Sequence, residues 1–221
     1  MRRIVGGAFV SLDGVMQAPG GPSEDYTGGF DHGGWLAPFW EDQIGEEVDR
    51  LFTEPFDLLL GRRTYDIFAA YWPYAQGDNK PMGTMLDRAG KYVLTHDDQP
   101  LDWQNSHRLA GLDELAELKR GDGPDLVIQG STTLYPQLLA AGLLDRVTVM
   151  IFPVVLGTGK RLFGDGTPPR TMRAVDHRTT PRGNIIATYE PAGQVEVGDF
   201  SSEPQSEREK VRQAGMKAGN W

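Results

Sequence analysis

Short apolar runs alternate along this chain with segments of helical periodicity, and this alternation limits the fold more than any other feature. Residues 4–10 and 56–60 are apolar runs typical of buried strands. Between them, Ile44, Val48 and Leu51 recur at the spacing of one helix face. Strands that alternate with helices need crossover connections. We therefore expect an α/β fold with a mainly parallel central sheet and helices on both faces.

The rest of the chain continues this pattern up to a polar end. Residues 147–156 and 185–189 are strand-like runs with no helix signal between them, so we expect an antiparallel edge. We find no repeat or linker, and we expect one domain over residues 1–192 and a polar tail over residues 193–221. Further strands are expected at residues 91–95 and 126–129, and further helices after an N-cap at Thr64, around Leu112, Leu115 and Leu118, around Leu134, Leu138 and Leu139, and weakly at residues 207–213.

The composition excludes several classes of function. The net charge is −9 and no basic cluster follows an expected helix, so nucleic acid is not an expected partner. The chain has no cysteine, and its four histidines lack metal-ligand spacing, so we expect no disulfide, thiolate or metal site. The N-terminus is too polar for a signal peptide and no segment is long enough to span a bilayer. We expect a cytoplasmic protein with no membrane partner.

One strand end carries the residue types that suit a phosphate. The apolar run at residues 126–129 ends in Gly130-Ser131-Thr132, after which a helix carrying Leu134 is expected. Such a junction presents backbone N–H groups and the positive end of a helix dipole, and glycine allows close approach. The same residues also fit an ordinary capped helix after a tight turn.

A second strand end repeats the arrangement and adds positive charge. Leu60 is followed by Gly61, Arg62, Arg63 and Thr64 at the expected start of a helix. Arginine suits a phosphate monoester because its planar fork donates several hydrogen bonds, although two arginines also suit a solvated surface. Ligands of open α/β sheets bind at the carboxyl ends of the strands, which is where both junctions lie.

Several motifs occur together in a fixed order: Ser11-Leu12-Asp13-Gly14, Gly61-Arg62-Arg63-Thr64-Tyr65 and Gln129-Gly130-Ser131, followed by residues 138–145 and 153–163. With these motifs the chain resembles, over about residues 2–190, the pyrimidine reductase domain of riboflavin biosynthesis (5-amino-6-(5-phosphoribosylamino)uracil reductase) and its dihydrofolate-reductase-like relatives. The resemblance implies a three-layer dihydrofolate-reductase-like fold and NADPH as cofactor.

The resemblance also assigns cofactor-binding roles along the sheet edge. The first strand would hold the nicotinamide carboxamide, the first junction the pyrophosphate and the 2′-phosphate, the third strand the adenine ribose, and the second junction the pyrophosphate and nicotinamide. The residues are, in that order, Phe9 and Val10; Gly61, Arg62, Arg63 and Thr64; Thr95 and His96; and Gln129, Gly130, Ser131, Thr132 and Leu134.

The carboxylates are the candidates for a catalytic role. Asp13 ends the first strand on the nicotinamide side, although it also suits support of the Asp-Gly turn. Glu46 and Asp49 on the first helix are further candidates, although they also suit a solvated helix face. The chain departs from dihydrofolate reductases at Gly45, which stands where their pterin-binding carboxylate is expected. This departure argues against folate as the substrate.

A long loop at residues 17–34 is rich in Gly, Pro, Ser and Asp, and is of the kind that closes over a substrate. Four aromatic side chains in or beside it suit either stacking on a planar heterocycle or packing in the core: Tyr26, Phe30, Trp35 and Trp40.

These observations predict an NADPH-dependent reductase that transfers a hydride to a small heterocyclic, imine or carbonyl substrate. A non-catalytic nucleotide- or pterin-binding module of the same fold and a purely structural α/β domain are the alternatives. The prediction requires that residues 61–64 and 129–132 lie side by side and together hold the dinucleotide. The apolar run at residues 147–156 is expected to pair or pack across a homodimer, as is common among the relatives.

Overall fold

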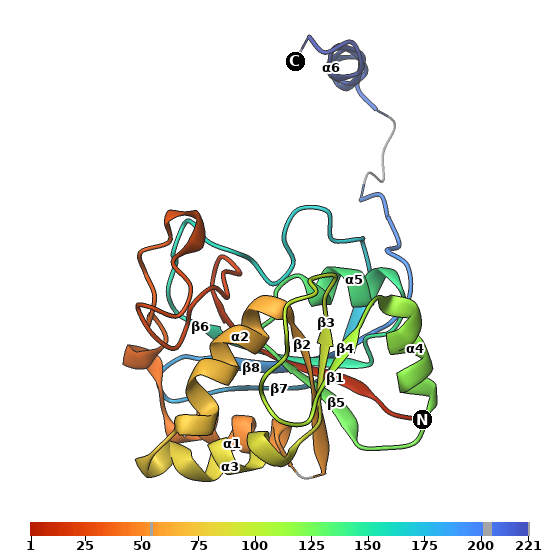
Figure 1. The fold of residues 1–221 in the computed structure, drawn as a ribbon. Helices are drawn as coiled ribbons and strands as arrows, with labels where there is room; N and C mark the ends of the chain where they lie inside the picture. The colour runs from red at the N-terminus through yellow and green to blue at the C-terminus, as the bar shows by residue number, and fades with distance from the viewer. Residues whose placement is uncertain (54, 201–204, 221) are drawn as a thin grey trace.

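The structure, a computed structural model, describes residues 1–53, 55–200 and 205–220. Eight strands form one sheet in the order β4-β3-β2-β5-β1-β6-β8-β7 (Figure 1). The strands from β4 to β6 in this order are parallel, and β8 and β7 add an antiparallel edge. The expected α/β architecture is confirmed. The strands are β1 (Ile4–Ser11), β2 (Phe56–Gly61), β3 (Lys91–Leu94), β4 (Ser106–Leu109), β5 (Asp125–Gln129), β6 (Arg146–Phe152), β7 (Met172–Thr179) and β8 (Ile185–Pro191).

Helices cover both faces of the sheet. Buried side chains of α4 and α5 pack on one face, and those of α1, α2 and α3 pack on the other. The helices are α1 (Asp42–Leu51), α2 (Arg62–Tyr71), α3 (Lys80–Arg88), α4 (Leu112–Arg120), α5 (Leu134–Ala140) and α6 (Glu207–Lys217).

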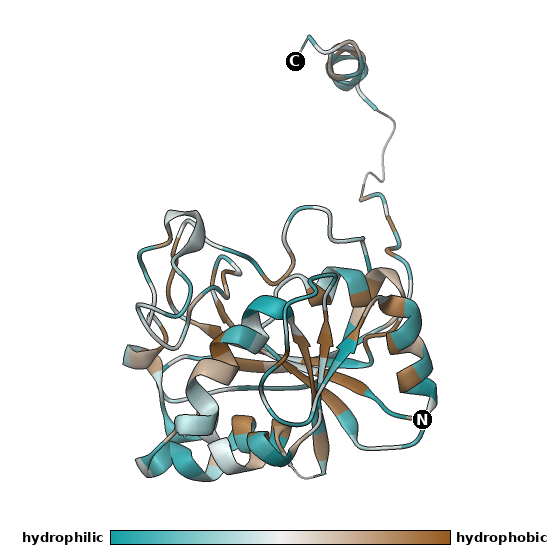
Figure 2. Ribbon diagram, in the orientation of Figure 1, coloured by the Kyte–Doolittle hydropathy of each residue, from teal (hydrophilic) through white to brown (hydrophobic). Residues whose placement is uncertain are grey.

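The central strands are apolar on both faces, which explains their nearly continuous apolar sequences. On β1, Ile4 packs with α4 and α5, whereas Val5 packs on the side of α2 and α3. On β2, Leu59 joins the first of these clusters, and Leu58 and Leu60 join the second. Figure 2 shows the same distribution, with hydrophobic colour concentrated on the central strands. Burial on both faces makes the sheet a rigid base for the loops at its carboxyl edge.

The prediction of an N-cap at Thr64 is wrong. Helix α2 begins at Arg62, and Gly61, in an extended conformation, is the residue that precedes it. Thr64 therefore lies in the first turn, where its hydroxyl accepts a hydrogen bond from the backbone N–H of Ser131. The side chain links two segments of the chain instead of capping its own helix.

The strand expected at residues 147–156 is shorter than its apolar run. It ends at Phe152, because Pro153 has no N–H to donate and the N–H of Val154 turns back to the carbonyl of Phe152 at 2.7 Å. Three elements have no counterpart in the sequence prediction: α3, β4 and β7. Each carries a weak apolar signal, and β7 is largely exposed at the edge of the sheet.

The C-terminal segment contains the helix expected near residues 207–213. It forms α6, which Ser206 caps by accepting a hydrogen bond from the N–H of Glu209, and which buries none of its residues. Across the described residues, no helix combines the length and apolar character that a membrane span requires. The same residues contain no cluster of His, Asp and Glu side chains suited to a metal ion.

A lysine is enclosed where β3 meets α3. Lys91 is fully buried, and its ammonium donates to the carbonyls of Asp87 at 2.8 Å and Ala89 at 2.9 Å. The ammonium also lies 4.2 Å from the centre of the Trp103 ring, which supplies a cation–π contact. Burial nevertheless lowers the pKa of Lys91 to about 8.

We predict that this lysine makes stability depend on pH in the alkaline range. Unfolded lysine titrates near 10.5, so above pH 8 the unfolded chain binds more protons than the folded one, and the free energy of unfolding should rise between pH 8 and 9.5. Urea denaturation at several pH values measures this slope. Lys91→Met should reduce it, whereas Lys80→Met, at an exposed position, should retain it. An equal slope in Lys91→Met would contradict the prediction.

Candidate functional site

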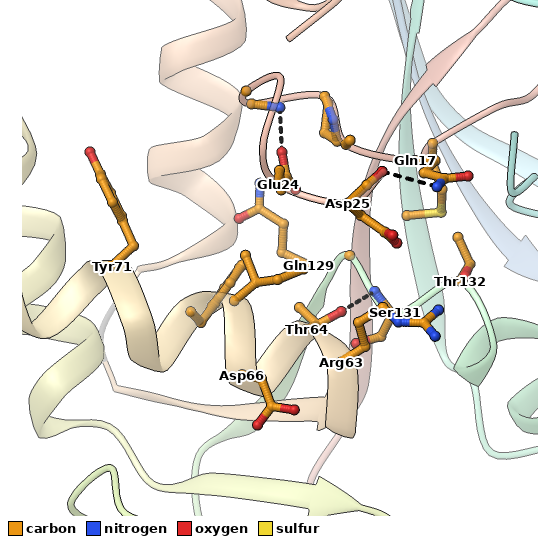
Figure 3. A pocket seen from close by; sticks show the side chains of 18 of the residues that line it. Gln17, Glu24, Asp25, Arg63, Thr64, Asp66, Tyr71, Gln129, Ser131 and Thr132 are labelled. Atoms are coloured by element: carbon orange, nitrogen blue, oxygen red, sulfur yellow. Dashed lines mark hydrogen bonds between the residues drawn. The ribbon is translucent and has the colours of Figure 1, made fainter. Parts of the chain in front are cut away.

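The two strand-to-helix junctions meet at the carboxyl edge of the sheet. We call residues 61–64 the first corner and residues 129–132 the second corner. Their strands, β2 and β5, are parallel neighbours. The N–H of Gly61 donates to the hydroxyl of Ser131 at 2.9 Å, and the N–H of Ser131 donates to the hydroxyl of Thr64 at 2.9 Å (Figure 3). The expectation that the corners lie side by side is confirmed.

The second corner has the backbone of a tight, left-handed turn. Gly130 has φ of 77° and Ser131 has φ of 57°. A Cβ atom on Gly130 would lie 3.0 Å from the methyl carbon of Thr64, so glycine allows the two corners to approach this closely. Ser131 takes an unfavourable conformation for a residue with a side chain, and its two hydrogen bonds to the first corner hold it there.

A cleft of about 920 Å³ opens above the corners. The two corners form its floor, α2 forms a side, and a loop that we call the covering loop (residues 16–25) lies opposite (Figure 3). The cleft extends along α2 to an aromatic end at Phe68, Tyr71 and Trp72, and Phe9 and Leu36 also line it.

Two of the cations in the cleft are neutralised by the protein. Arg62 forms an ion pair with Asp66, in which Nε donates to both carboxylate oxygens, and it also donates to the carbonyl of Gln99 at 3.0 Å. Lys160 forms an ion pair with Asp25 of the covering loop and donates to the hydroxyl of Thr27 at 2.7 Å.

Arg63 is the exception. It is exposed, and its guanidinium has no hydrogen bond or ion pair to the part of the chain that the structure describes. Its guanidinium lies beside Ser131 and Thr132 in Figure 3. An unpaired arginine next to a left-handed turn is an arrangement that can hold a phosphate.

The covering loop carries an isolated carboxylate. Glu24 is half-buried, and its carboxylate accepts a hydrogen bond from the N–H of Gly20 at 2.7 Å. Burial raises its pKa above the usual value. No cation of the described chain forms an ion pair with it. Glu24 and Gln129 both line the cleft, and Figure 3 shows their side chains in it.

The comparisons with known proteins agree with this geometry. The family model of the RibD C-terminal domain matches residues 2–186. The chain belongs to this family. The uncharacterized protein YyaP of Bacillus subtilis (strain 168) is 26% identical to it over 194 residues, which span 85% of this chain and 94% of YyaP.

Solved structures share the fold at low sequence identity. A candidate riboflavin biosynthesis protein from Shewanella sp. PV-4 matches with a TM-score of 0.63 at 18% identity, over 87% of this chain and 99% of its own. A dihydrofolate reductase from Enterococcus faecalis, solved with NADP(H), matches with a TM-score of 0.51 at 14% identity, over 86% and 96% of the two chains. The RibD C-terminal domain family and the dihydrofolate-reductase-like fold together support an oxidoreductase of the reductase type.

The cofactor residues implied by the resemblance fall into two groups in this family member. Those that line the cleft are Phe9, Gly61, Arg62, Arg63, Thr64, Gln129, Gly130, Ser131 and Thr132. Four others lie outside its lining. Val10 and Leu134 are buried in the core with α4 and α5, and Thr95 and His96 follow β3, next to the first corner in the sheet.

Asp13 lies outside the cleft lining, and its hydrogen bonds give it a structural role. Its carboxylate accepts hydrogen bonds from the Ser11 hydroxyl at 2.6 Å and from the N–H groups of Leu156 at 3.1 Å and Gly157 at 2.8 Å. The Ser11 hydrogen bond, assisted by these N–H groups, lowers the pKa of Asp13 to about 2. Asp13 therefore anchors the turn that follows β6, and it carries no proton to donate near neutral pH.

The other two catalytic candidates lie outside the cleft lining. Glu46 and Asp49 are exposed on α1, as a solvated helix face requires. The buried carboxylate of this helix is Glu47, which accepts a hydrogen bond from Arg178 at 2.6 Å. Helix α1 thus directs its carboxylates to solvent or to the edge strand β7.

The aromatic residues of the long loop divide between core and surface. Phe30 and Trp35 are buried with Phe152, so packing is the alternative that the structure supports for them. Tyr26 is 70% exposed, and Trp40 lies edge-on to Phe9 at 6.3 Å.

The polar residues that line the cleft and that the sequence analysis missed include Gln17, Glu24, Asp25 and Lys160. Three of them are joined across the fold. The N–H of Lys160 donates to the amide oxygen of Gln17 at 3.0 Å, and the Gln17 amide donates to the carbonyl of Asp25 at 3.0 Å. The glycine-rich sequence of the loop indicated a binding segment. The contacts of Lys160 with Gln17 and Asp25 span more than 130 residues, so no local sequence pattern could predict them.

We predict that Ser131 holds the two corners together. Ser131→Ala leaves the buried N–H of Gly61 without its acceptor, which should lower the free energy of unfolding by about 1–3 kcal/mol. Urea denaturation measures the loss. Ser106→Ala, on edge strand β4, is the control and should cost less. Equal losses in the two variants would contradict a special role for Ser131.

Proposed function

We propose that this chain is an NADPH-dependent reductase that transfers a hydride to a small heterocyclic, imine or carbonyl substrate. The observation that carries the proposal is the pair of hydrogen-bonded corners beneath the cleft. Family membership supports a reductase. The solved dihydrofolate reductase of the same fold was complexed with NADP(H), which supports the choice of cofactor.

The residues of the corners fit a phosphorylated dinucleotide. Gly130 has no side chain to obstruct close approach to the backbone. A Cβ atom there would also crowd Thr64 of the first corner. Arg63 offers a guanidinium that no acidic side chain of the described chain neutralises, and Arg62 lies one residue before it. The unpaired Arg63 favours NADPH over NADH, because the 2′-phosphate adds negative charge.

The mechanism that we propose gives the protein a binding and orienting role. NADPH, when bound, supplies the hydride. Residues 61–64 and 129–132 would hold the phosphates, with Arg63 as the main counter-charge. Phe9 and the covering loop would exclude water from the part of the cleft that remains for the substrate. A cleft without water favours hydride transfer to the substrate carbon, because water could otherwise take part in side reactions.

We predict that Arg63→Ala weakens NADPH binding by about 10- to 100-fold, since a charge-assisted hydrogen bond contributes about 1.5–3 kcal/mol. Quenching of protein fluorescence during titration with NADPH measures the affinity. Arg88→Ala, an exposed arginine outside the cleft lining, should bind NADPH like the wild type.

Three outcomes separate the candidate functions. Oxidation of NADPH at 340 nm with a panel of imines, pterins and pyrimidines supports the reductase. Binding of NADPH with no turnover of any of them supports the non-catalytic module. Failure of the wild type to bind NADPH removes the cofactor from the proposal and favours a structural domain.

We also propose that the chain forms a homodimer through the face of the sheet at β6, a strand that lies between β1 and β8. An apolar hollow of about 330 Å³ lies there, lined in part by Val147, Val149 and Ile151 of that strand. Leu12 and Phe163 at its rim are 60% and 41% exposed. A second copy of the chain would remove this apolar surface from water.

We predict that sedimentation velocity gives the mass of a dimer for the wild type. Leu12→Glu should shift the protein to monomer, because a carboxylate in an apolar interface must be desolvated. Tyr74→Glu, at a 73% exposed position outside the hollow, should remain dimeric. A monomeric wild type would refute the dimer.

A further inference from the structure

The charges that line the cleft are not spread evenly, and their placement limits the substrate. We propose that the space left beside the cofactor takes an unphosphorylated, planar nitrogen heterocycle, with an N–H edge directed at Glu24 and Gln129. This inference rests on the proposed function, because it assumes that the corners hold the phosphates of a dinucleotide.

The first argument concerns the cations. Among the described residues, the basic side chains in the lining are Arg62, Arg63 and Lys160. Arg62 is paired with Asp66, and Lys160 is paired with Asp25. Arg63 is unpaired, but it lies at the corners, beside Ser131 and Thr132. Once the cofactor occupies the corners, no free cation remains in this lining to balance a phosphate on the substrate.

The second argument concerns the isolated carboxylate. Glu24 has no ion-pair partner within the described chain, and it lies close in sequence to a second acid, Asp25. An anionic group on the substrate would be repelled here, whereas an N–H donor or a protonated ring would be attracted. The side-chain amide of Gln129, in the same lining, adds an N–H donor and a carbonyl acceptor, which suits the alternating edge of a nitrogen heterocycle (Figure 3).

The third argument concerns the walls. Phe68, Tyr71 and Trp72 line the end of the cleft away from the corners, and Phe9 and Leu36 add further apolar surface. Phe68 and Trp72 lie edge to face at 6.1 Å, so each is held by its neighbour. Ordered aromatic walls with a few polar groups favour a flat ring over a flexible polar chain.

The three arguments distinguish the proposed substrate from a phosphoribosyl-bearing pyrimidine, which is the kind of compound that the name of the riboflavin enzyme describes. They also place the carboxylate that recognises the ring on the covering loop, because α1 presents none to the cleft lining. The substrate class is thus a planar, uncharged or cationic nitrogen ring without a phosphate.

Three ligands of one ring system test the class. We would use 5-benzyl-2,4-diaminopyrimidine, its analogue with a phosphonate on the benzyl ring, and the neutral dimethyl ester of that phosphonate. Calorimetric titrations would be run with the wild-type protein, both free and saturated with NADPH. We expect the NADPH-saturated protein to bind the parent and the ester at least 10-fold more tightly than the phosphonate. Phosphonate binding as tight as the ester, or no binding of the parent, would overturn the proposal.

The variant Glu24→Gln tests the recognition itself. It should weaken binding of the parent compound at least 10-fold while leaving the affinity for NADPH unchanged, which also shows that the variant is folded. Glu117→Gln, an exposed residue of α4, is the matched control and should bind the parent like the wild type. Unchanged binding of the parent in Glu24→Gln would refute the role of Glu24. Because the parent is titrated with and without NADPH, a failure of cofactor binding is seen separately from a failure of ring recognition.

Discussion

The cleft depends on the reciprocal hydrogen bonds that join Gly61, Thr64 and Ser131. The two bonds connect positions 70 and 67 residues apart, at the ends of neighbouring strands. A left-handed residue such as Ser131 costs about 1–2 kcal/mol, and two hydrogen bonds of about 1 kcal/mol each are enough to offset that cost. The two hydrogen bonds therefore hold the turn at Ser131 in its left-handed conformation and fix the distance between the two corners. That distance sets the width of the site that a phosphate would occupy.

This local lock works because the sheet beneath it is rigid. Strands β2 and β5 are buried on both faces, so their carboxyl ends cannot shift independently. The antiparallel edge contributes differently. Arg178 of β7 pairs with Glu47 of α1, which ties the first helix to the edge and turns its buried carboxylate away from the cleft. The departure at Gly45 thus belongs to a helix with a structural function.

The sequence was enough to predict six of the eight strands that the structure describes, a mainly parallel sheet and both corners, because each of these depends on local signals. An apolar run followed by glycine identifies a strand end, and the parallel arrangement brings such ends to one edge. The positions of Asp25 and Lys160 could not be predicted in this way, since the two are joined across 135 residues, and Glu24 lies next to Asp25 on the same loop. The role of Thr64 was mistaken for the same reason, because its partner is Ser131 and not its own helix.

A continuous set of contacts links the end of β1 to the cleft and gives Asp13 an indirect role. Asp13 fixes the turn at Leu156 and Gly157, and that turn leads to Lys160. The backbone and ammonium of Lys160 hold the covering loop through Gln17 and Asp25, and Glu24 is the residue next to Asp25. Asp13, whose pKa is lowered, therefore helps to position the covering loop, which carries Glu24, whose pKa is raised. The covering loop thus presents Glu24 in the cleft lining, to which α1 contributes no carboxylate. Because Asp13 holds the turn and the turn holds the loop, the two segments act as a unit.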